Sequence, residues 1–585
     1  MKPTKLLRQS PVAITPKTWD LKASSPLVSE LSSKTGLTPL QARVLINRGI
    51  SDKDAVRSFM DPRLADMADP MLLKGMDKVL STILKAVEKN EKITIYGDYD
   101  ADGLTATALL LHFFSSLDIP VSSYIPNRFT EGYGLNSSAV DIIAKNGTGL
   151  LITVDCGISD SAVIAQALNS GMEVVVTDHH QIPEDYEALC PVINPHQPGC
   201  CFPYKELAGV GLAFFLVVAL RAALREKGMF EADQEPDLRI YLDLVALGTV
   251  GDRVPLLGQN RILVANGLSR IAWSRWAGIE AIKEVSGVNE SDITSDDLGF
   301  RLAPRLNAPG RMDDPEIGLA LLMARDTSVA KNLAEETNSA NRHRQRVEQG
   351  ILEEIEESLI HPRELSESRV LVVAGRDWHQ GVLGIVASRL VERYYRPTLV
   401  MDIKDGLAVG SGRSIKGFNL YGALCRLSYL LEKFGGHAHA AGFTLRKENI
   451  EKLKNGLRDL AAQALVKEDL RPTIKVDGEI SLEALSVEII HQIRALSPFG
   501  EGNPEPIFWV RSVDVLDSRI VGERHLKLRV REKQKVFDAI GFGMSGWHPL
   551  TGETIQMLFT PQMNCWKGHK SIQLRIVDLK RPVDL

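Results

Sequence analysis

Three aspartates stand at alternate positions in the motif DYDADG, namely Asp98, Asp100 and Asp102. Carboxylates this close repel one another unless cations lie between them, and hard divalent ions such as Mg²⁺ and Mn²⁺ prefer oxygen ligands. Gly103 then allows the chain to turn into a helix. A calcium-binding EF-hand loop is excluded, because its further ligands and its glutamate at position twelve are absent. By itself the motif therefore indicates either a metal site or an exposed acidic turn.

More candidate ligands follow other apolar runs along the chain. Asp155 comes after one such run and Asp252 after another. Between them, a third run ends in the triplet Asp178, His179 and His180. Adjacent histidines alone are usually surface residues, but Mn²⁺ accepts imidazole together with carboxylate. A ring of five or more such donors has enough ligands for two metal ions about 3.5–4 Å apart that share a carboxylate, which predicts a two-metal phosphoesterase.

Short apolar runs alternate with helical stretches around these residues. The runs Lys92–Gly97, Gly149–Val154 and Glu173–Thr177 are typical of buried strands, and a helical stretch at Leu104–Leu117 follows the first. This alternation predicts a parallel sheet in an α/β domain, with strands buried on both faces. Ligands of such sheets bind beyond the carboxyl ends of the strands. Because the acids and histidines come directly after the runs, we expect them to gather at one edge.

The length of 585 residues is too great for a single hydrophobic core and predicts several domains. After the α/β domain, a strongly polar pattern with apolar residues at four-residue spacing indicates a long connecting helix. A second α/β unit follows, with strands after Arg369 and at Pro397–Met401 and a Gly- and His-rich loop near Gly435. We place the boundaries at 1–90 (helical or mixed), 91–325 (parallel-sheet domain), 326–360 (connecting helix), 361–470 (second α/β unit) and 471–585 (β-barrel).

The C-terminal region contains short β-rich runs separated by turns, a spacing that is typical of a small barrel of the OB-fold type. The predicted strands are Ile507–Ser512, Leu526–Arg531, Val536–Phe542, Ile555–Thr560 and Ser571–Val577. In LKLRVRE, Lys527, Arg529 and Arg531 alternate with apolar residues, so they face one side of a strand. Such a face follows the backbone of single-stranded DNA through charge. The alternative is an edge strand that carries cations against aggregation.

The formal net charge of −5 argues against a simple nucleic-acid coat protein, but it does not exclude a nuclease whose carboxylates bind metal. The six cysteines form no C-x-x-C pair, so neither a disulfide framework nor a zinc ribbon is expected. No apolar stretch follows the basic N-terminus, and the charge-free run Leu207–Leu220 is shorter than the ~20 residues that span a bilayer. We expect a cytoplasmic protein without a signal peptide or a membrane segment.

Several motifs together resemble those of a known superfamily. DYDADG, VDCG, TDHH and GDxxPL look like the four motifs of the DHH phosphoesterase superfamily, and WHQGVLGIVASRL, GSGRS and GGHAHAAG resemble its DHHA1 companion domain. PRLNAPGRM and SPFGEGNPEP narrow the resemblance to the RecJ family of bacterial single-strand-specific 5′→3′ exonucleases. The resemblance covers nearly the whole chain beyond Lys92. It departs at Pro309, which replaces the usual small residue and is expected to stiffen a turn, and near Asp98, before which many superfamily members carry a histidine.

The resemblance implies a role for each residue of the ring. Two Mn²⁺ or Mg²⁺ ions would be held, with Asp155 as the bridge and Asp98 in support, by the set Asp98, Asp100, Asp102, Asp155, His179 and Asp252. His180 would contact the scissile phosphate, and Asp178 would orient the histidines. The metal ions would lower the pKa of a bound water that attacks the 5′-terminal phosphodiester.

An exonuclease of this polarity must recognise a 5′ end, and a terminal phosphate is best bound by arginine forks and loop amides. A single arginine is usually a surface residue, so the arginines inside Gly-containing motifs carry the most weight. The resemblance places the phosphate pocket at Arg128, Arg311, Ser411, Arg413 and His437.

Three functions fit the ring of ligands. The first is an exonuclease that degrades single-stranded DNA 5′→3′ to mononucleotides in DNA repair and recombination. The second is a phosphoesterase of the same superfamily that acts on short oligonucleotides or small phosphoesters, and the basic barrel after Arg471 favours the polymer over it. The third is an inactive scaffold, which the complete set of ligands disfavours. Because no Walker loop (GxxxxGK[ST]) is present, we expect a separate helicase and a single-strand-binding protein as partners of a monomeric enzyme.

Overall fold

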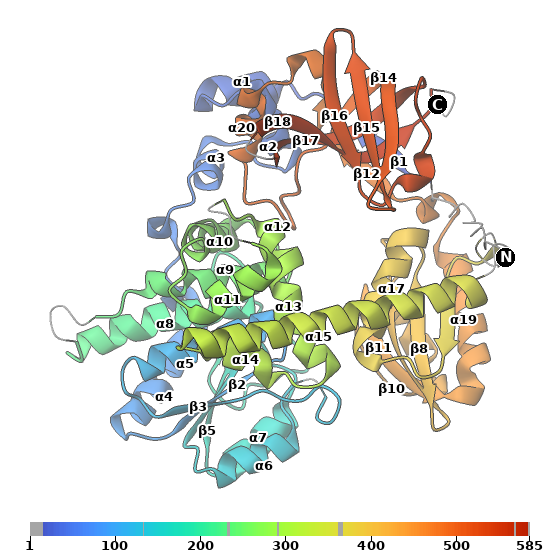
Figure 1. Ribbon diagram of the computed structural model, residues 1–585. Helices are drawn as coiled ribbons and strands as arrows, with labels where there is room; N and C mark the ends of the chain where they lie inside the picture. The colour runs from blue at the N-terminus through green and yellow to red at the C-terminus, as the bar shows by residue number, and fades with distance from the viewer. Residues whose placement is uncertain are drawn as a thin grey trace. The chain divides into compact units, whose positions relative to one another are not determined.

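The computed structural model describes residues 16–132, 134–230, 235–288, 292–360, 365, 367–566 and 569–582 (Figure 1). The expectation that the chain has no signal peptide concerns its N-terminus, and residues 1–15 lie outside the described part of the chain. The chain divides into two units. One, called here the parallel-sheet unit, comprises Arg48–His343 and Ala495–Glu505. The other, called the barrel unit, comprises Met1–Asn47, Arg344–Arg494 and Pro506–Leu585.

The sheet of the parallel-sheet unit has strands in the order β3-β2-β4-β5-β6, and every neighbouring pair is parallel. The predicted strands are present and almost wholly buried, as expected for a sheet covered on both faces. Two further strands fall outside the prediction, because β3 has the polar sequence VSSY and β6 is very short. The bounds are β2 Ile93–Gly97, β3 Val121–Tyr124, β4 Leu150–Val154, β5 Glu173–Thr177 and β6 Val192–Ile193.

Helices cover both faces of this sheet. α5 is buried along almost its whole length because it packs among other helices of the larger core. Most of the charge-free run Leu207–Leu220 lies in the buried part of α8. α6 and α7 pack on the opposite face around a smaller core. The bounds are α3 Lys53–Met60, α4 Met76–Glu88, α5 Ala101–Ser115, α6 Ser137–Lys145, α7 Ser161–Asn169, α8 Gly209–Glu226, α9 Leu242–Gly251, α10 Gly258–Ile271, α11 Ala277–Ser286, α12 Ser295–Asp297, α13 Ala303–Met312 and α14 Glu316–Met323.

The predicted connecting helix is present as α15, Thr327–Glu354, and its residues belong to both units. Its sequence contains no proline and a single glycine, Gly350, so little interrupts the helical backbone. The motif PRLNAPGRM corrects another expectation. Pro309 lies inside helix α13 and stiffens no turn, although proline in a helix removes one backbone hydrogen bond.

The second α/β unit is a mixed sheet with strands in the order β10-β11-β9-β8-β7. Only β7 and β8 are parallel. The Gly- and His-rich segment predicted as a loop is a hairpin of β10 and β11, in which Gly435 pairs with Gly442. The bounds are β7 Leu371–Gly375, α17 Gln380–Tyr394, β8 Thr398–Lys404, β9 Leu407–Arg413, α18 Leu420–Arg426, β10 Leu431–His437, β11 Ala440–Arg446 and α19 Ile450–Ala464.

The C-terminal strands form a closed barrel, as predicted. Its order is β14-β15-β16-β18-β17, and β17 pairs with β14 to close it. β13 adds to β14, and near the N-terminus β1 pairs with β12. The bounds are β1 Thr18–Leu21, α1 Leu27–Thr35, α2 Pro39–Asn47, β12 Thr473–Val476, β13 Gly478–Glu479, α20 Val487–Arg494, β14 Phe508–Val521, β15 His525–Glu532, β16 Lys535–Gly541, β17 Thr554–Trp566 and β18 His569–Lys580.

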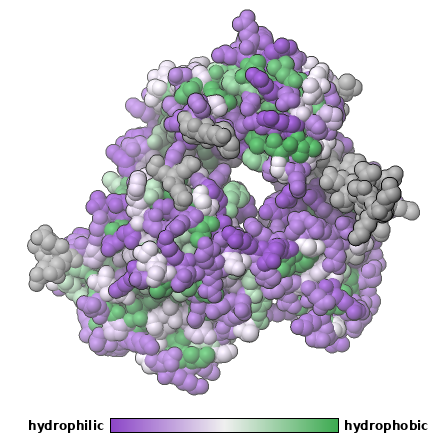
Figure 2. Space-filling view, viewed as in Figure 1, coloured by the Kyte–Doolittle hydropathy of each residue, from purple (hydrophilic) through white to green (hydrophobic). Residues whose placement is uncertain are grey.

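The visible surface is mostly hydrophilic, with apolar residues in small separate patches (Figure 2). Among the described residues, none of the helices combines the length and the apolar character that crossing a membrane requires.

Candidate metal centre and nucleic-acid contacts

The DYDADG motif spans the turn after strand β2 and the first residues of helix α5. Asp100 is the N-cap of α5, where its Oδ1 accepts hydrogen bonds from the backbone N–H groups of Asp102 (3.0 Å) and Gly103 (3.2 Å). A Cβ on Gly103 would lie 2.5 Å from the backbone oxygen of Asp98, so only glycine fits this close approach. The turn therefore presents its carboxylates on a fixed backbone at the carboxyl end of the sheet.

Asp102 is fully buried against the start of helix α8. Its carboxylate accepts hydrogen bonds from the backbone N–H groups of Gly209 (2.6 Å) and Val210 (2.9 Å). A helix N-terminus stabilises negative charge, which favours the ionised form of this side chain. Gly209 is also required sterically, because a Cβ there would lie 2.8 Å from the Cβ of Asp155.

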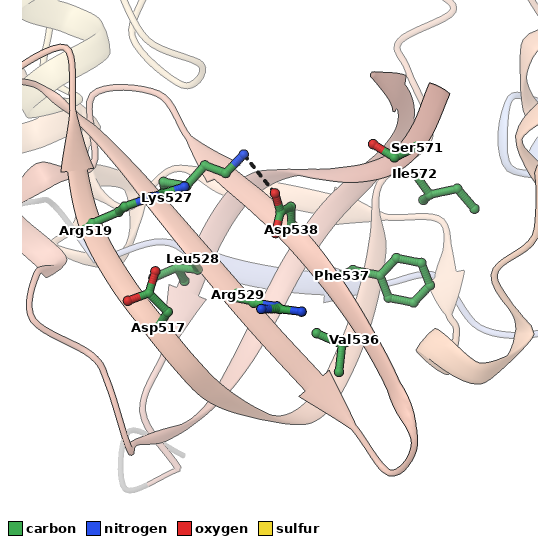
Figure 3. Close-up of a pocket in the computed structure, with 10 residues that line it drawn as sticks. All are labelled: Asp517, Arg519, Lys527, Leu528, Arg529, Val536, Phe537, Asp538, Ser571 and Ile572. Carbon is green, nitrogen blue, oxygen red and sulfur yellow. Dashed lines mark ion pairs between the residues drawn. The ribbon is translucent and has the colours of Figure 1, made fainter. Parts of the chain in front are cut away.

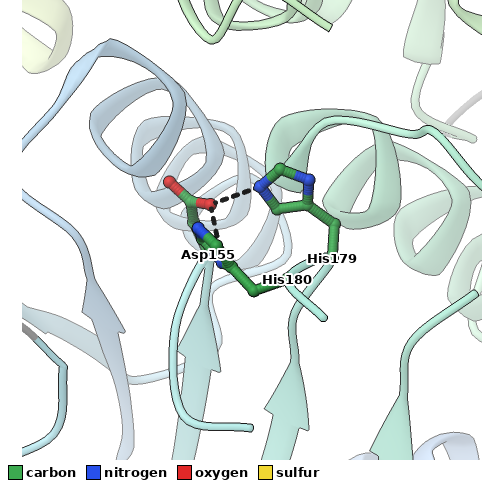
Figure 4. A group of neighbouring side chains, drawn as sticks. All are labelled: Asp155, His179 and His180. Atoms are coloured by element: carbon green, nitrogen blue, oxygen red, sulfur yellow. Dashed lines mark ion pairs between the residues drawn. The ribbon is translucent and has the colours of Figure 1, made fainter. Parts of the chain in front are cut away.

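Asp155 and His179 form the centre of the cluster (Figure 4). Asp155 follows β4 in a left-handed backbone conformation, with φ of 61°, which is uncommon for a residue with a side chain. The Nε2 atom of His179 lies 3.0 Å from Asp155 Oδ1, 3.8 Å from Asp102 Oδ2 and 3.7 Å from Asp252 Oδ2. Side chains that are far apart in sequence thus lie together at the carboxyl edge of the sheet, as the sequence predicted.

His180 differs from His179 in its exposure and in its partner. Its side chain is 46 % exposed, against 11 % for His179, and its Nδ1 lies 2.8 Å from Asp178 Oδ1. Asp178 is buried, and its other oxygen accepts a hydrogen bond from the backbone N–H of Ile158 (2.9 Å). Asp178 therefore orients His180 at the solvent side of the cluster.

The side chains form three groups whose ligand atoms lie within 4.8 Å of one another. Among the described residues, Asp98 Oδ1 and Asp252 Oδ2 are buried without a hydrogen-bond partner. Asp155 Oδ1 and His179 Nε2 are buried too, and their contact at 3.0 Å lacks the geometry of a hydrogen bond. Buried polar atoms without partners are rare in proteins unless a water molecule or an ion satisfies them. Asp155 and His179 each belong to two of the groups, and of these two Asp155 is the carboxylate, the type of ligand that bridges two metal ions. The groups are Asp98, Asp100 and Asp155; Asp102, His179 and Asp252; and Asp155, His179 and His180.

The electrostatics of the cluster also favour bound cations. Burial, together with repulsion from neighbouring aspartates, raises the pKa of Asp98, Asp102 and Asp155 well above the ordinary value, and burial likewise raises the pKa of Asp252. Burial alone would lower the pKa of His180, but the hydrogen bond with Asp178 and the surrounding carboxylates outweigh it and raise that pKa. Negative charge accumulated in a buried site calls for a positive charge in the same place.

Two features of this centre do not follow from the rule that ligands gather at the ends of parallel strands. Asp252 stands at the C-terminal end of helix α9, and the residue after it, Arg253, has a left-handed backbone with φ of 64°. Asn307 of α13 accepts a hydrogen bond from the backbone N–H of Ala101 (2.6 Å), and a Cβ on Gly310 would lie 3.0 Å from the backbone oxygen of Tyr99. The PRLNAPGRM motif, noticed first for its arginines, thus also supports the DYDADG turn.

The arginines predicted to bind phosphate in the parallel-sheet unit both lie near Tyr99. The guanidinium of Arg128 is 5.6 Å from the centre of the Tyr99 ring. Burial raises the pKa of Tyr99, and the positive charges of Arg128 and Arg311 act against that shift. Glu131 holds the loop of Arg128 by accepting hydrogen bonds from the Tyr124 hydroxyl (2.7 Å) and from the backbone N–H of Asn127 (2.7 Å).

The remaining phosphate candidates cluster in the barrel unit. Arg413 donates a hydrogen bond to the Ser411 hydroxyl (3.1 Å) on strand β9, and a Cβ on Gly384 of α17 would lie 2.9 Å from an Arg413 nitrogen. His437 is exposed at the end of β10, and burial of its ring, then the charges of His439 and Arg413, lower its pKa. Of the three predicted residues of this unit, Arg413 is the permanent cation, Ser411 accepts its hydrogen bond, and His437 lies close enough for the charge of Arg413 to lower its pKa.

The barrel carries the predicted cations on the outer side of β15. Leu526, Leu528 and Val530 are buried, and Lys527, Arg529 and Arg531 alternate with them. Acidic neighbours were not foreseen from the sequence: Lys527 pairs with Asp538 (3.0 Å) and Arg531 with Asp514 (3.2 Å). Within the part of the chain that the structure describes, Arg529 has no ion-pair partner. It lines a groove of about 410 Å³ with Asp517, Arg519, Lys527, Leu528, Val536, Phe537, Asp538, Ser571 and Ile572 (Figure 3).

Three family models match successive parts of the chain. The DHH family N-terminal domain matches residues 92–249, the DHHA1 domain residues 367–463, and the RecJ OB domain residues 476–578.

Relatives of known name are similar over almost the whole chain. The single-stranded-DNA-specific exonuclease RecJ of Bacillus subtilis is 37 % identical, over 96 % of this chain and 70 % of its own. RecJ of Escherichia coli is 38 % identical, over 94 % of this chain and 96 % of its own. Among solved structures, the chain is similar to the crystal structure of RecJ in complex with Mn²⁺ from Thermus thermophilus, with 30 % sequence identity and a TM-score of 0.83. The superposition covers 97 % of this chain and 80 % of the Thermus thermophilus chain. A second crystal structure of that protein is in complex with Mg²⁺.

Proposed function

This chain belongs to the RecJ family of single-stranded-DNA-specific exonucleases, and we propose that it releases mononucleotides from the 5′ end of single-stranded DNA. Its similarity to RecJ proteins over nearly the whole of this chain makes it a metal-dependent exonuclease that is specific for single strands. The observation that carries the proposal within the molecule is the buried Asp and His cluster, in which Asp155 belongs to two groups of donors.

The donors fit two divalent cations, Mn²⁺ or Mg²⁺. The ions would be held by the carboxylates and one imidazole of the cluster, with Asp155 as the shared carboxylate. These ligands are Asp98, Asp100, Asp102, Asp155, His179 and Asp252. Such ions supply an activated water and offset the charge that develops on the phosphate during attack. The helix α8 amides fix the carboxylate of Asp102, and the backbone of the α5 N-terminus fixes that of Asp100.

His180 is the candidate for contact with the scissile phosphate. It is the more exposed histidine of the pair, and Asp178 binds its Nδ1, which leaves the Nε2 edge of the ring directed at a substrate. With Asp178 on Nδ1, the ring of His180 could donate a hydrogen bond to a phosphate oxygen or a proton to the leaving oxygen.

Recognition of the end and of the strand would use separate cationic groups. In the parallel-sheet unit, Arg128 and Arg311 would bind phosphate oxygens. In the barrel unit, Ser411, Arg413 and His437 form a second candidate group for binding phosphate. The arginine forks suit a phosphate with several unesterified oxygens. Lys527, Arg529 and Arg531 of the barrel would contact the backbone of a longer strand.

The cellular setting is part of the same proposal. The enzyme would act as a cytoplasmic monomer in DNA repair and recombination, on single strands supplied by a helicase and covered by a single-strand-binding protein. This setting rests on the family membership and on the lack of a Walker loop in the sequence.

The test uses purified enzyme with Mn²⁺ and single-stranded DNA labelled at either end. We expect immediate release of 5′-labelled mononucleotide, while the 3′ label stays on shortening chains. Release of the 3′ label first would refute the polarity. Hydrolysis of pyrophosphate or of a cyclic dinucleotide with DNA left intact would support the small-substrate alternative and would remove the role of the barrel.

One variant separates chemistry from metal binding. His180→Asn should lower kcat by about 10²–10⁴-fold while Mn²⁺ still binds, because the ring is assigned to the phosphate. Equal loss of kcat and of Mn²⁺ binding in this variant would instead assign His180 to the metal ions.

A further inference from the structure

The segment Ala495–Glu505, called here the inserted segment, belongs to the parallel-sheet unit, although the chain before and after it belongs to the barrel unit. Helix α20 ends directly before it, and barrel strand β14 begins shortly after it at Phe508. The inserted segment contains most of the SPFGEGNPEP motif, to which the metal chemistry assigns no role.

Arg261 of helix α10 binds the inserted segment from inside the parallel-sheet unit. Its side chain is 2 % exposed, and its guanidinium donates hydrogen bonds to the backbone oxygens of Leu496 (3.1 Å), Ser497 (2.6 Å) and Pro498 (3.1 Å). It donates another to the backbone oxygen of Phe59 (2.7 Å) and lies over that ring. Among the described residues no carboxylate pairs with Arg261, so this buried cation is held by carbonyl oxygens of the inserted segment and of Phe59.

The inserted segment is also held together from within. Asn503 is completely buried and donates hydrogen bonds to the backbone oxygens of Leu496 (2.9 Å) and Pro498 (2.8 Å). The backbones of Gly500 and Asn503 bond to each other in both directions. Ser295 donates a hydrogen bond to the backbone oxygen of Phe499, which adds a second attachment to the parallel-sheet unit.

The tip of the inserted segment contacts the loop that follows Asp252. The backbone N–H of Leu256 donates to the backbone oxygen of Glu501 (2.8 Å). A Cβ on Gly500 would lie 2.7 Å from Leu256 Cδ1, and a Cβ on Gly502 would lie 3.0 Å from Leu257 Cδ1. The two glycines therefore allow the segment to lie directly on this loop.

We propose that the inserted segment is a positioning element for the metal centre, in which Arg261 and Asn503 fix the segment and the segment fixes the loop of Asp252. Three residues separate Asp252 from the hydrogen bond at Leu256, and the first of them, Arg253, has a left-handed backbone. A shift of the loop therefore moves the carboxylate of Asp252 away from His179. The proposal rests on the assignment of Asp252 as a metal ligand, and Arg261 is a positioning residue that does not touch metal or substrate.

The test measures Mn²⁺ binding by titration calorimetry on full-length protein without DNA. Gly502→Ala should raise the Kd of at least one Mn²⁺ ion about tenfold, because its Cβ pushes on Leu257. Gly228→Ala is the matched control: φ is 71° at Gly228 and 73° at Gly502, but no atom lies within 4 Å of a Cβ on Gly228. Circular dichroism and melting curves establish that both variants fold.

A milder variant covers the case in which Gly502→Ala fails to fold. Ser295→Ala removes one hydrogen bond to the segment, and we expect its Kd for Mn²⁺ to rise about threefold, with kcat recovered at high Mn²⁺ concentration and KM for DNA unchanged. Mn²⁺ affinities of Ser295→Ala or of Gly502→Ala equal to that of Gly228→Ala would overturn the proposal. A wild-type chain that binds no Mn²⁺ would overturn both the proposal and the metal assignment beneath it.

Discussion

Replacement of Asp155 by asparagine should stabilise the metal-free protein while it abolishes metal binding. The ligand atoms of Asp98, Asp100 and Asp155 lie within 4.8 Å of one another, and Asp155 Oδ1 is buried without a hydrogen-bond partner. Asparagine has nearly the same shape, carries no charge and tolerates the left-handed backbone found here. The substitution therefore removes repulsion without creating a cavity or backbone strain.

The size of the effect follows from the distances. Two unit charges 4.8 Å apart repel by about 3.5 kcal/mol at an effective dielectric constant of about 20. Partial protonation of the cluster reduces this repulsion, and we expect a net gain of about 2 kcal/mol in the free energy of unfolding at pH 8, or about 4 °C in Tm. The assay is thermal unfolding in EDTA, followed by circular dichroism.

The dependence on pH has a definite sign. The raised pKa of Asp155 means that the folded metal-free protein binds a proton more tightly than the unfolded chain. Its contribution to stability is therefore full below the unfolded pKa of about 4 and is lost as the pH rises through the raised folded value. Because Asp155→Asn lacks this group, its advantage over the wild type should grow between pH 5 and pH 8.

Asp243→Asn is the matched control. Asp243 is also buried and its pKa is also raised by burial, but it accepts hydrogen bonds from Ser274 (2.6 Å) and Trp276 (3.1 Å). Asparagine would turn one acceptor toward a donor and destabilise the protein by about 1–3 kcal/mol. If Asp155→Asn lowers Tm in EDTA as this control does, the carboxylates are not in mutual repulsion and the metal interpretation is refuted. Saturating Mn²⁺ should raise Tm of the wild type and of Asp243→Asn but not of Asp155→Asn, since binding to the folded state at 100 times Kd adds about 2.7 kcal/mol.

Three further variants test other parts of the site. Gly209→Ala should weaken Mn²⁺ binding at least tenfold in calorimetry, because its Cβ would lie 2.8 Å from the Cβ of Asp155. The control is Gly211→Ala in the same helix. Its Cβ would have its nearest neighbour at 3.6 Å, so this variant should bind Mn²⁺ like the wild type. Arg529→Ala should weaken binding of a 30-nucleotide single strand and reduce the slope of log K against log salt by about 0.7, measured by fluorescence anisotropy. Arg413→Lys should raise KM for 5′-phosphorylated DNA about tenfold and leave 5′-hydroxyl DNA nearly unaffected, because lysine lacks the fork that binds two phosphate oxygens.

The metal cluster of the parallel-sheet unit could be predicted because it depends on local pattern and on one topological rule. Strands β2, β4 and β5 are apolar runs of ordinary length, and each ends in candidate ligands. In a parallel sheet these ends lie along one edge, so contacts between Asp102, Asp155 and His179 follow without knowledge of the loops. The chemical roles of these residues stay predictions.

Other elements could not be predicted because tertiary contacts override local signals. Glycine is a poor strand former, yet Gly435 and Gly442 pair within the β10–β11 hairpin. Proline is a poor helix former, yet Pro309 lies in α13, where Asn307 and Gly310 of the same motif meet the DYDADG turn. The acids that pair with the barrel cations come from neighbouring strands, so no pattern within LKLRVRE could indicate them.

The buried carboxylates link these observations. A protein that only had to fold would gain nothing from Asp98, Asp102 and Asp155, since burial and repulsion raise their pKa values and destabilise the charged forms. The surrounding chain nonetheless fits closely around them, with Gly209 against Asp155 and the amides of α8 directed at Asp102. Without metal, the fixed carboxylates repel one another and lower the stability of the folded chain. Divalent cations relieve this repulsion when they bind, so the same repulsion destabilises the metal-free protein and increases its affinity for metal.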